Sequence, residues 1–238
     1  RGAIIFNTPT SKFIFSDGEL VLNKSEKTIS QIIISEAMIL MGYVTSLFLL
    51  QNNLAGAYRS QKINCNPIEL LDKYKSSEIK YILLKQYMGK SNISTKPNKH
   101  ECLGLDTYVQ CTSPLRRYLD LIIQRQVYNK INNNELIDIN TLSNIIDYSR
   151  SRQLENNNIY KNDKLKYLFI FFNNNNNSIY KIIFVKWINH KRNIALVYFP
   201  EYFLEVLVIL YVSVDIYTNK VYKVKYNKND NNLLEFIC

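Results

Sequence analysis

Two adjacent arginines, Arg116 and Arg117, are the residues of this chain best suited to binding or stabilising an anion. They lie in the run Thr112-Ser113-Pro114-Leu115-Arg116-Arg117-Tyr118-Leu119-Asp120. A Ser or Thr before a proline suits the N-cap of a helix, and the proline suits its first position. The run therefore predicts that both arginines lie in the first helical turn. The positive end of the helix dipole disfavours them there unless an anion such as a phosphate lies opposite.

A second interpretation leaves the arginines in water. Asp120 lies four residues after Arg116, a spacing at which opposite charges pair on the surface of a helix. The two arginines would then be ordinary surface residues. Both interpretations need the same helix, because apolar residues continue the run at helical spacing. The predicted buried stripe consists of Leu115, Leu119, Ile122 and Ile123.

The surroundings of the arginines resemble a known enzyme family. The stretch from Met88 to Gln126 is similar to the ribonuclease II/R exoribonucleases, particularly their cyanobacterial and plastid branch, in which a TSP-(I/L)-R-R-Y-x-D-L helix follows such a loop. The stretch Ile34–Gly42 resembles the family's helix with a (V/I)-S-E-x-M-I-L core. Tyr58–Gln61 resembles the (F/Y)-R-x-Q turn that follows that helix.

The resemblance implies roles in RNA cleavage. Arg116 would contact the scissile phosphate and stabilise the charge that develops on it. Arg117 and Tyr118 would support the position of the RNA. Glu155 would help to hold the terminal nucleotide, although Asn156 stands where the family usually has arginine. An exposed, solvated glutamate is the alternative for Glu155. The other residues expected to bind RNA are Ser113, Tyr108, Arg59 and Lys99.

The resemblance also implies magnesium, held by an aspartate cluster upstream of the part that this chain resembles. Arg1–Pro9 looks like the family's R-G-A segment just before its long helix, so we expect a C-terminal piece that lacks the cluster. The acids of the chain show no tight spacing that would build an octahedral oxygen site. They include Asp17, Glu19, Asp72, Asp106 and Asp120. The four cysteines show no C-x-x-C spacing and the two histidines are isolated, so zinc is not expected either.

The charge of the chain favours an anionic partner. The 238 residues carry a formal net charge of +10, which suits nucleic acid or an acidic membrane surface. The segment from Lys85 to Lys130 contains eight Lys or Arg and three Asp or Glu, and Tyr87, Tyr108 and Tyr118 are interleaved with them. Cations for phosphates and aromatic faces for bases are what single-stranded RNA binding needs.

An apolar stretch, Ile29–Leu50, is nearly long enough to span a bilayer. Gln31 and Glu36 interrupt it, and an apolar face is typical of a buried globular helix. That face comprises Ile33, Ala37, Leu40, Val44 and Leu47. We therefore expect most of this helix to be core, and no membrane partner.

The second half of the chain predicts a long helix and then a small barrel. Thr141–Phe172 has a helical pattern with a possible break at Asn156–Asn158, and Asn173–Asn177 is typical of a linker. The predicted strands that follow are Tyr180–Trp187, Ile194–Phe199, Leu204–Val214 and Lys220–Tyr226. The expected fold class is thus α+β. The resemblance implies that residues 1–172 form the C-terminal, largely helical half of an RNB nuclease domain, and that residues 178–238 form an S1/OB-like RNA-binding barrel.

Three hypotheses follow. The leading one is a 3′-5′ exoribonuclease that hydrolyses single-stranded RNA to nucleoside 5′-monophosphates, with the upstream half of the nuclease domain as partner, in the same protein or as a separate chain. The Asn-, Lys-, Ile- and Tyr-rich composition indicates an AT-rich genome. Together with the resemblance to the cyanobacterial branch, this favours an intracellular, plastid-type setting, with the cytoplasm as the alternative. The alternative is a non-catalytic RNA-binding module or subunit. The third is a remnant whose apolar surface is left uncovered.

Overall fold

A computed structural model describes residues 2–4, 10–64, 84–85, 87–174, 179–202, 204–211, 217, 220–227 and 233–236. The chain divides into two compact units. The first unit comprises Arg1–Phe6, Lys27–Lys75 and Leu83–Glu155, and the second comprises Asn7–Glu26, Ser76–Ile82 and Asn156–Cys238. Both helices and strands are present, as the sequence predicts, and the helices dominate the first unit.

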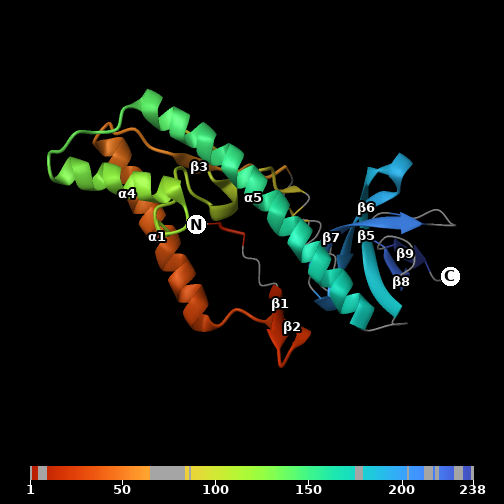
Figure 1. Ribbon diagram of the computed structural model, residues 1–238. Coiled ribbons are helices and arrows are strands. Elements are labelled where there is room, and N and C mark those ends of the chain that lie inside the picture. Colours follow the sequence, from red (N-terminus) through yellow and green to blue (C-terminus); the bar gives the residue numbers. More distant parts are fainter. Residues whose placement is uncertain are drawn as a thin grey trace. The chain divides into compact units, whose positions relative to one another are not determined.

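The first unit is built from helices around short strands (Figure 1). Its elements are α1 (Ile29–Gln51), β3 (Tyr58–Ser60), β4 (Asn92–Ser94), the 3-10 helix η1 (Glu101–Leu103), α4 (Tyr118–Ile131) and the first part of α5 (Ile139–Asn174). Strands β3 and β4 pair antiparallel. One apolar cluster joins the three helices to the loops between them. It contains Leu49, Leu54, Ala57, Tyr58, Val109, Cys111, Ile122, Ile123, Leu142 and Ile146.

Helix α1 begins at a reciprocal capping box. The Thr28 hydroxyl accepts from the amide of Gln31 at 3.3 Å, and the Gln31 side chain accepts from the amide of Thr28 at 3.1 Å. The helix ends at Asn52, and Asn53 then takes a left-handed conformation with φ 53°. There the amide of Leu54 donates to the carbonyl of Leu49 at 2.8 Å, which satisfies one of the last helical carbonyls.

The prediction that the apolar face of α1 is core is wrong for most of its length. Ile33, Leu40 and Val44 have exposed fractions of 61%, 61% and 52%. The residues that α1 does bury are Gly42, Thr45, Ser46 and Leu49. Small side chains lie on the buried side because the backbone near residue 109 approaches the helix closely. The helix is long and apolar enough to cross a membrane by length and composition alone, and 22% of its most apolar window is buried.

The second unit joins a β-hairpin, the end of α5 and a closed five-stranded sheet. Strands β1 (Thr10–Ser16) and β2 (Glu19–Ser25) pair antiparallel across Asp17 and Gly18, whose φ angles are 52° and 82°. Positive φ at both central residues is the geometry that Asp-Gly hairpin turns favour. The sequence prediction does not include this hairpin, although an Asp-Gly pair is typical of a hairpin turn.

The closed sheet has the strand order β5-β6-β7-β9-β8. Its strands are β5 (Ile179–Asn189), β6 (Ile194–Phe199), β7 (Leu204–Tyr211), β8 (Val221–Asn227) and β9 (Leu233–Phe236), with 3-10 helices η2 (His190–Arg192) and η3 (Pro200–Tyr202) between them. Neighbouring strands are antiparallel except β7 and β9, which run parallel. The predicted strands match β5 to β8 within two residues where the chain is described, and β9 is additional.

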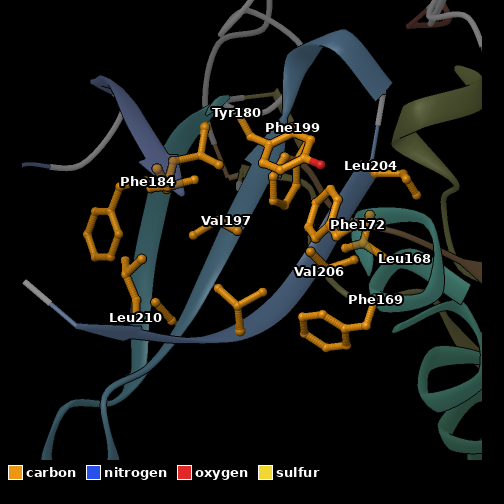
Figure 2. Packing of buried hydrophobic residues seen from close by; sticks show 14 residues of the cluster. Leu168, Phe169, Phe172, Tyr180, Phe184, Val197, Phe199, Leu204, Val206 and Leu210 are labelled. Carbon is orange, nitrogen blue, oxygen red and sulfur yellow. The ribbon is translucent and has the colours of Figure 1, made fainter. Parts of the chain in front are cut away.

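The core of the second unit lies between the sheet and the last turns of α5 (Figure 2). Phe172 is fully buried, with its ring centroid 4.1 Å from that of Tyr180 and 5.5 Å from that of Phe199. The predicted break at Asn156–Asn158 is wrong, because α5 is one helix of 36 residues. Asparagine costs only tenths of a kcal/mol in a helix, which packing at both ends overrides. Asn173 and Asn174 of the predicted linker end α5, and residues 175–177 lie outside the described part.

We expect the exposed face of α1 to contribute little to the stability of the chain. A Leu40→Gln/Val44→Gln variant should change the free energy of unfolding by about 0.5 kcal/mol or less and should reduce both binding of a hydrophobic dye and self-association. Leu49→Ala, at a fully buried position of the same helix, should cost about 2–5 kcal/mol. Chemical denaturation and light scattering measure both effects. Equal losses for the two variants would contradict this account of α1.

Candidate functional site

The paired arginines lie on a turn that precedes α4, so the prediction that they lie in the first helical turn is wrong. The carbonyl of Ser113 accepts from the amides of Arg116 and Arg117 at 3.3 and 3.0 Å. The helix begins at Tyr118, and its N-cap is Arg117, which has an extended backbone with φ −127° and ψ 110°. The site is therefore a turn, residues 112–117, that is fixed to the start of a helix.

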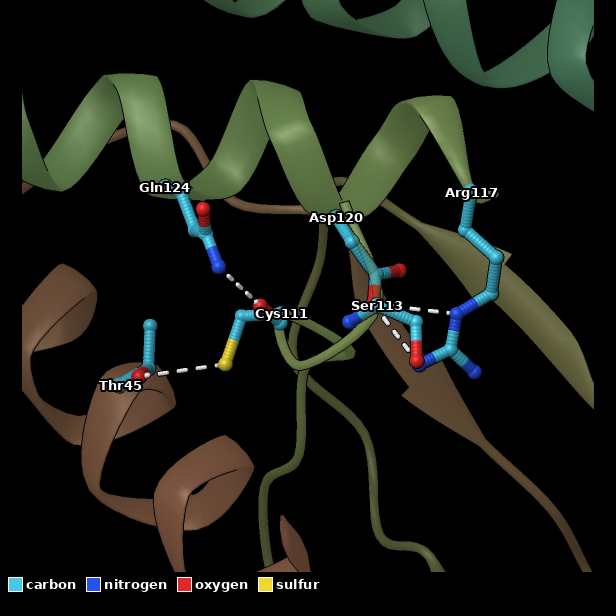
Figure 3. A network of polar contacts seen from close by, with 6 residues as sticks. All are labelled: Thr45, Cys111, Ser113, Arg117, Asp120 and Gln124. Carbon is cyan, nitrogen blue, oxygen red and sulfur yellow. Dashed lines mark hydrogen bonds and ion pairs between the residues drawn. The ribbon is translucent and has the colours of Figure 1, made fainter. Parts of the chain in front are cut away.

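Asp120 holds this turn in place (Figure 3). One oxygen of its carboxylate, Oδ2, accepts hydrogen bonds from the amide of Ser113 at 2.8 Å and from Nε of Arg117 at 3.0 Å. The same oxygen lies 2.7 Å from Nη2 of Arg117 in an ion pair. The Asp120 side chain is 1% exposed, and such a carboxylate needs partners because its desolvation is costly. The ion pair therefore forms three residues apart, with Arg117, and the predicted pair with Arg116 is wrong.

Arg116 and two of its neighbours face solvent. Arg116 is exposed and makes no ion pair with any residue that the structure describes. Tyr118 is 52% exposed. Leu115, expected in the buried stripe, is fully exposed because the turn carries it outside the helix. Ile122 and Ile123 are buried as predicted, and Leu119 is partly buried.

Helix α1 positions the segment that leads into the turn. A β-carbon added to Gly42 would lie 2.4 Å from Cε2 of Tyr108 and 2.4 Å from the carbonyl oxygen of Val109. The amide of Val109 donates to the Gly42 carbonyl at 3.4 Å. Only glycine allows this approach, because any side chain would overlap the backbone of the segment. The segment therefore lies directly on the helix.

Cys111 receives support from both sides of the segment (Figure 3). Its Sγ lies 3.5 Å from Oγ1 of Thr45 on α1, and its carbonyl accepts from Nε2 of Gln124 on α4 at 2.6 Å. Burial raises the pKa of the Cys111 thiol and also that of Cys102. Both thiols are free and buried, which is unsuited to nucleophilic chemistry. Cys65 and Cys238 lie outside the described residues.

Arg59 approaches the same segment from β3. Residues 58–60, expected in a turn, form this strand because they pair with β4. In addition, Tyr58 bridges Val109, and the amide of Arg59 donates to the carbonyl of Tyr108 at 2.8 Å. Nη2 of Arg59 donates to Oγ of Ser91 at 3.1 Å. Partial burial lowers the pKa of Arg59, and the positive charge of Arg117 lowers it further. The guanidinium nevertheless remains charged, because arginine is not deprotonated in proteins.

Tyr108 and His100 pack together near Arg59. Their rings meet edge to face, with centroids 5.6 Å apart and an angle of 86° between the planes. Both side chains are buried, and burial raises the pKa of Tyr108. Burial, and secondly the charge of Arg59, lowers the pKa of His100 to about 4. His100 is therefore neutral near pH 7 and supports the site through packing.

Two of the predicted site residues are ion-paired with other partners. Nζ of Lys99 lies 3.2 Å from Oδ1 of Asp106, and both side chains are well exposed. Glu155 pairs with Arg152 on α5 at 2.8 Å, also in an exposed position. Exposed pairs of this kind contribute at most about 1 kcal/mol and open readily. Arg59, Tyr108, Arg117 and Asp120, by contrast, lie close enough for their charges to influence one another.

The described residues combine anion-binding groups without a metal site. Arg59, Arg116 and Arg117 bring three positive charges to this region, and Asp120 brings one negative charge. Among these residues no group of three or more His, Cys, Asp or Glu is placed to hold a metal ion. Asp72 lies outside the described part. The arrangement can bind phosphates and stabilise negative charge, but the residues described do not fit a magnesium site.

Sequence reasoning missed the role of three residues. Asp120 was assigned to the wrong arginine, because helical spacing was assumed for a residue that lies before the helix. Gly42 was treated as part of a motif and not as a contact. His100 was treated as isolated. Only Asp120 carried a usable signal, since an acid three residues after an extended arginine can reach back to the preceding backbone, as in a capping box.

Comparisons with known proteins agree with the motifs. The model of the RNB domain family matches residues 1–133. An uncharacterized ribonuclease of Synechocystis sp. is 26% identical over 208 residues, which is 86% of this chain and 31% of that protein. The mitochondrial exoribonuclease II of Schizosaccharomyces pombe is 37% identical over 119 residues, covering 44% of this chain and 12% of that protein.

A solved structure shares the fold. RNase R of Mycoplasma genitalium, in complex with ribose-methylated single-stranded RNA, superposes with a TM-score of 0.78 at 16% identity, covering 99% of this chain and 46% of that chain. The chain thus spans less than half of this structure and less than a third of each of the two curated relatives.

We expect Gly42→Ala to destabilise the first unit. Alanine is favoured over glycine in a helix by about 1 kcal/mol, but here its methyl group would overlap Tyr108 and Val109, and such overpacking costs about 1–3 kcal/mol. Ala37→Gly, at an exposed position of the same helix, measures the difference in helix propensity between alanine and glycine without the contact. Urea denaturation of both variants tests the contact. A gain in stability for Gly42→Ala would show that the close approach is absent.

We expect acid to destabilise the fold through His100. The unfolded chain takes up this proton near the ordinary pKa of about 6.5, whereas the folded chain takes it up near pH 4. Between these values the unfolded state binds more protons, so stability falls as the pH is lowered, by up to about 3 kcal/mol. His100→Phe keeps the ring contact and should flatten the fall, as measured by denaturation between pH 7 and pH 4.5. The same replacement at the exposed His190 is the control, and an unchanged slope in His100→Phe would contradict the assignment.

Proposed function

The chain belongs to the RNB domain family, and from this membership we propose that it works as the C-terminal part of a 3′-5′ exoribonuclease. The substrate would be single-stranded RNA and the products nucleoside 5′-monophosphates. The observation that carries the proposal is the exposed guanidinium of Arg116, held on a fixed turn within the residues that the family model matches. A charge placed in advance, on a turn anchored by a buried ion pair, is suited to stabilising a developing negative charge without reorganisation.

In this proposal Arg116 contacts the scissile phosphate. Its planar guanidinium can donate two parallel hydrogen bonds to phosphate oxygens, which the ammonium group of lysine cannot reproduce. The exposed ring of Tyr118, two residues later, is available to a base or ribose. Arg59, Tyr108 and Ser113 line the same region. Lys99 and Glu155 would reach RNA only after their exposed ion pairs open.

Magnesium would be supplied through aspartates outside these 238 residues, in the upstream half of an RNB domain. This partner, in the same polypeptide or as a separate chain, would also account for α1. The apolar face of α1 lies within the matched residues, and in the first unit no described element covers Ile33, Leu40 or Val44. In this proposal the exposed apolar residues of α1 would form the interface with that partner. The matched relatives are two or more times longer than this chain, so they contain further chain that could cover such a face.

The sheet of the second unit would act as an S1/OB-like barrel that binds the RNA strand. Its closed order of five strands, with one parallel pair, suits that fold, a five-stranded Greek-key barrel. Trp187 is partly exposed and meets His190 edge to face, with ring centroids 4.9 Å apart. Lys186 and Lys223 are exposed on β5 and β8. In the register of β5 and β8, Lys223 lies opposite Lys181, so it would supply a cation at a different point of the sheet from Trp187.

The setting would be a plastid or a related compartment. The Asn- and Lys-rich composition and the similarity to proteins of Synechocystis and of mitochondria support an organellar origin.

The test is an exonuclease assay on labelled single-stranded RNA with magnesium, using this chain alone and together with an upstream RNB segment. We expect cleavage only in the combination. Arg116→Ala in the combination should lower turnover by about 10²–10³-fold and affinity by far less, and Arg116→Lys should recover little. Arg125→Ala, at another exposed arginine of the same region, is the control.

Two outcomes would overturn this function. RNA binding without cleavage, even with the upstream segment, would favour a non-catalytic RNA-binding subunit. Unchanged turnover in Arg116→Ala would remove Arg116 from the reaction.

A further inference from the structure

We propose that Asp120 is a positioning residue that decides which of the two adjacent arginines meets RNA. By binding Arg117 it removes that guanidinium from the RNA surface, and the same contact leaves Arg116 facing outward. This inference rests on the proposed function, because it assumes that RNA binds at the 112–117 turn. It assigns opposite roles to two neighbouring residues of the same type.

The contacts of Asp120 select Arg117 and leave out Arg116. Three contacts converge on Oδ2 of Asp120: hydrogen bonds from the amide of Ser113 and from Nε of Arg117, and an ion pair with Nη2 of Arg117. The amide bond fixes the beginning of the turn and the arginine bonds fix its end, so one carboxylate closes the loop. Arg116 lies between these two points, and it forms no ion pair with Asp120 or with any other residue that the structure describes. It precedes the N-cap, so helical spacing does not apply to it.

Burial strengthens the ion pair between Arg117 and Asp120. The side chain of Asp120 is 1% exposed and that of Arg117 is 28% exposed. The second carboxylate oxygen, Oδ1, is buried and has no hydrogen-bond partner within the described residues. Among the described residues, the contacts that compensate the negative charge of Asp120 are therefore all made through Oδ2. If Arg117 turned outward to a phosphate, it would leave a buried carboxylate without its main partner, which is strongly unfavourable.

Binding of a phosphate by Arg116 carries no comparable cost. It is exposed, and it can bind a phosphate without breaking an ion pair with any described residue. The third arginine of the region, Arg59, is held on β3 by its backbone and by Ser91. A phosphate that reaches the turn would therefore meet Arg116 first.

The experiment measures the affinity of the full chain for a short single-stranded RNA as a function of salt concentration. Each arginine that neutralises a phosphate contributes about 0.7 to the slope of log affinity against log salt. Arg116→Gln should lower the slope by about this amount. Arg117→Gln, the same change one residue later, should leave the slope unchanged.

The decisive variant combines two changes. Asp120→Asn keeps the shape of the side chain but removes its charge, so Arg117 is released toward the RNA. In Arg116→Gln/Asp120→Asn the slope should return to the value of the unsubstituted chain, because Arg117 replaces Arg116. A purely structural role for Asp120 predicts no such recovery.

Asp147→Asn is the matched control. Asp147 pairs with Arg150 three residues away at 3.1 Å, with the same spacing as Asp120 and Arg117 but in an exposed position. Arg150 also donates to the carbonyl of Ile93 at 2.9 Å, so this change removes a negative charge without freeing the arginine. Recovery of the slope in Arg116→Gln/Asp147→Asn would show that the loss of any acidic charge suffices and would overturn the proposal. A lower slope in Arg117→Gln would overturn it as well.

A measurement on the unsubstituted chain covers the case in which the Asp120 variants do not fold. In an NMR spectrum of arginine Nε–H groups, Arg117 should exchange slowly with solvent and keep its chemical shift when RNA is added, whereas Arg116 should shift. A shift confined to Arg117 would overturn the proposal. RNA binding that leaves both signals unchanged would refute the site at this turn, and absence of RNA binding would refute the proposed function with it.

Discussion

The contact between Gly42 and the backbone of Tyr108 and Val109 sets the position of the candidate site. Because α1 has no side chain at this point, the segment 108–111 lies against the helix itself. Thr45 and Gln124 then hold Cys111 from two helices, and the chain enters the turn in a fixed direction. The carboxylate of Asp120 closes the turn two residues after the start of α4. A single close backbone approach is thus connected to the direction of an arginine side chain.

Electrostatics and burial act against each other in this region. Three arginines and one carboxylate leave an excess of positive charge, and partial burial makes the charge on Arg59 less favourable. A neutral histidine behind them avoids adding a further cation, since burial and the charge of Arg59 keep its pKa low. The protein tolerates this excess because other interactions in the unit, chiefly the apolar cluster around Leu49, Val109 and Ile123, supply the stability. An anion would relieve the remaining repulsion.

Local patterns were predictable from the sequence where the side chains and the backbone agree. Ile122 and Ile123 follow the helical period and are buried, and β6 falls on the predicted residues 194–199. The start of α4 at Tyr118 differs from the prediction, because Ser113 and Pro114 favour an earlier start, whereas Asp120 binds the Ser113 amide and Arg117 and keeps the residues between them in a turn. The prediction for α1 chose the wrong buried side, because apolar residues cover more of the helix than the surface that it buries. The side that packs is the one that contacts Tyr108, and this contact cannot be read from the sequence.

The exposed stripe on α1 bears on how the cell would maintain such a chain. A protein that displays this much apolar surface while unassembled is recognised by chaperones and proteases, whose activity follows the fraction of molecules with accessible apolar segments. A separately encoded copy would persist only while a covering partner is synthesised in matching amounts. Its abundance would then be set by the supply of that partner and would be largely insensitive to its own rate of synthesis. The stoichiometry of assembly would be controlled through the lifetime of the orphan chain, by the side chains of one helix.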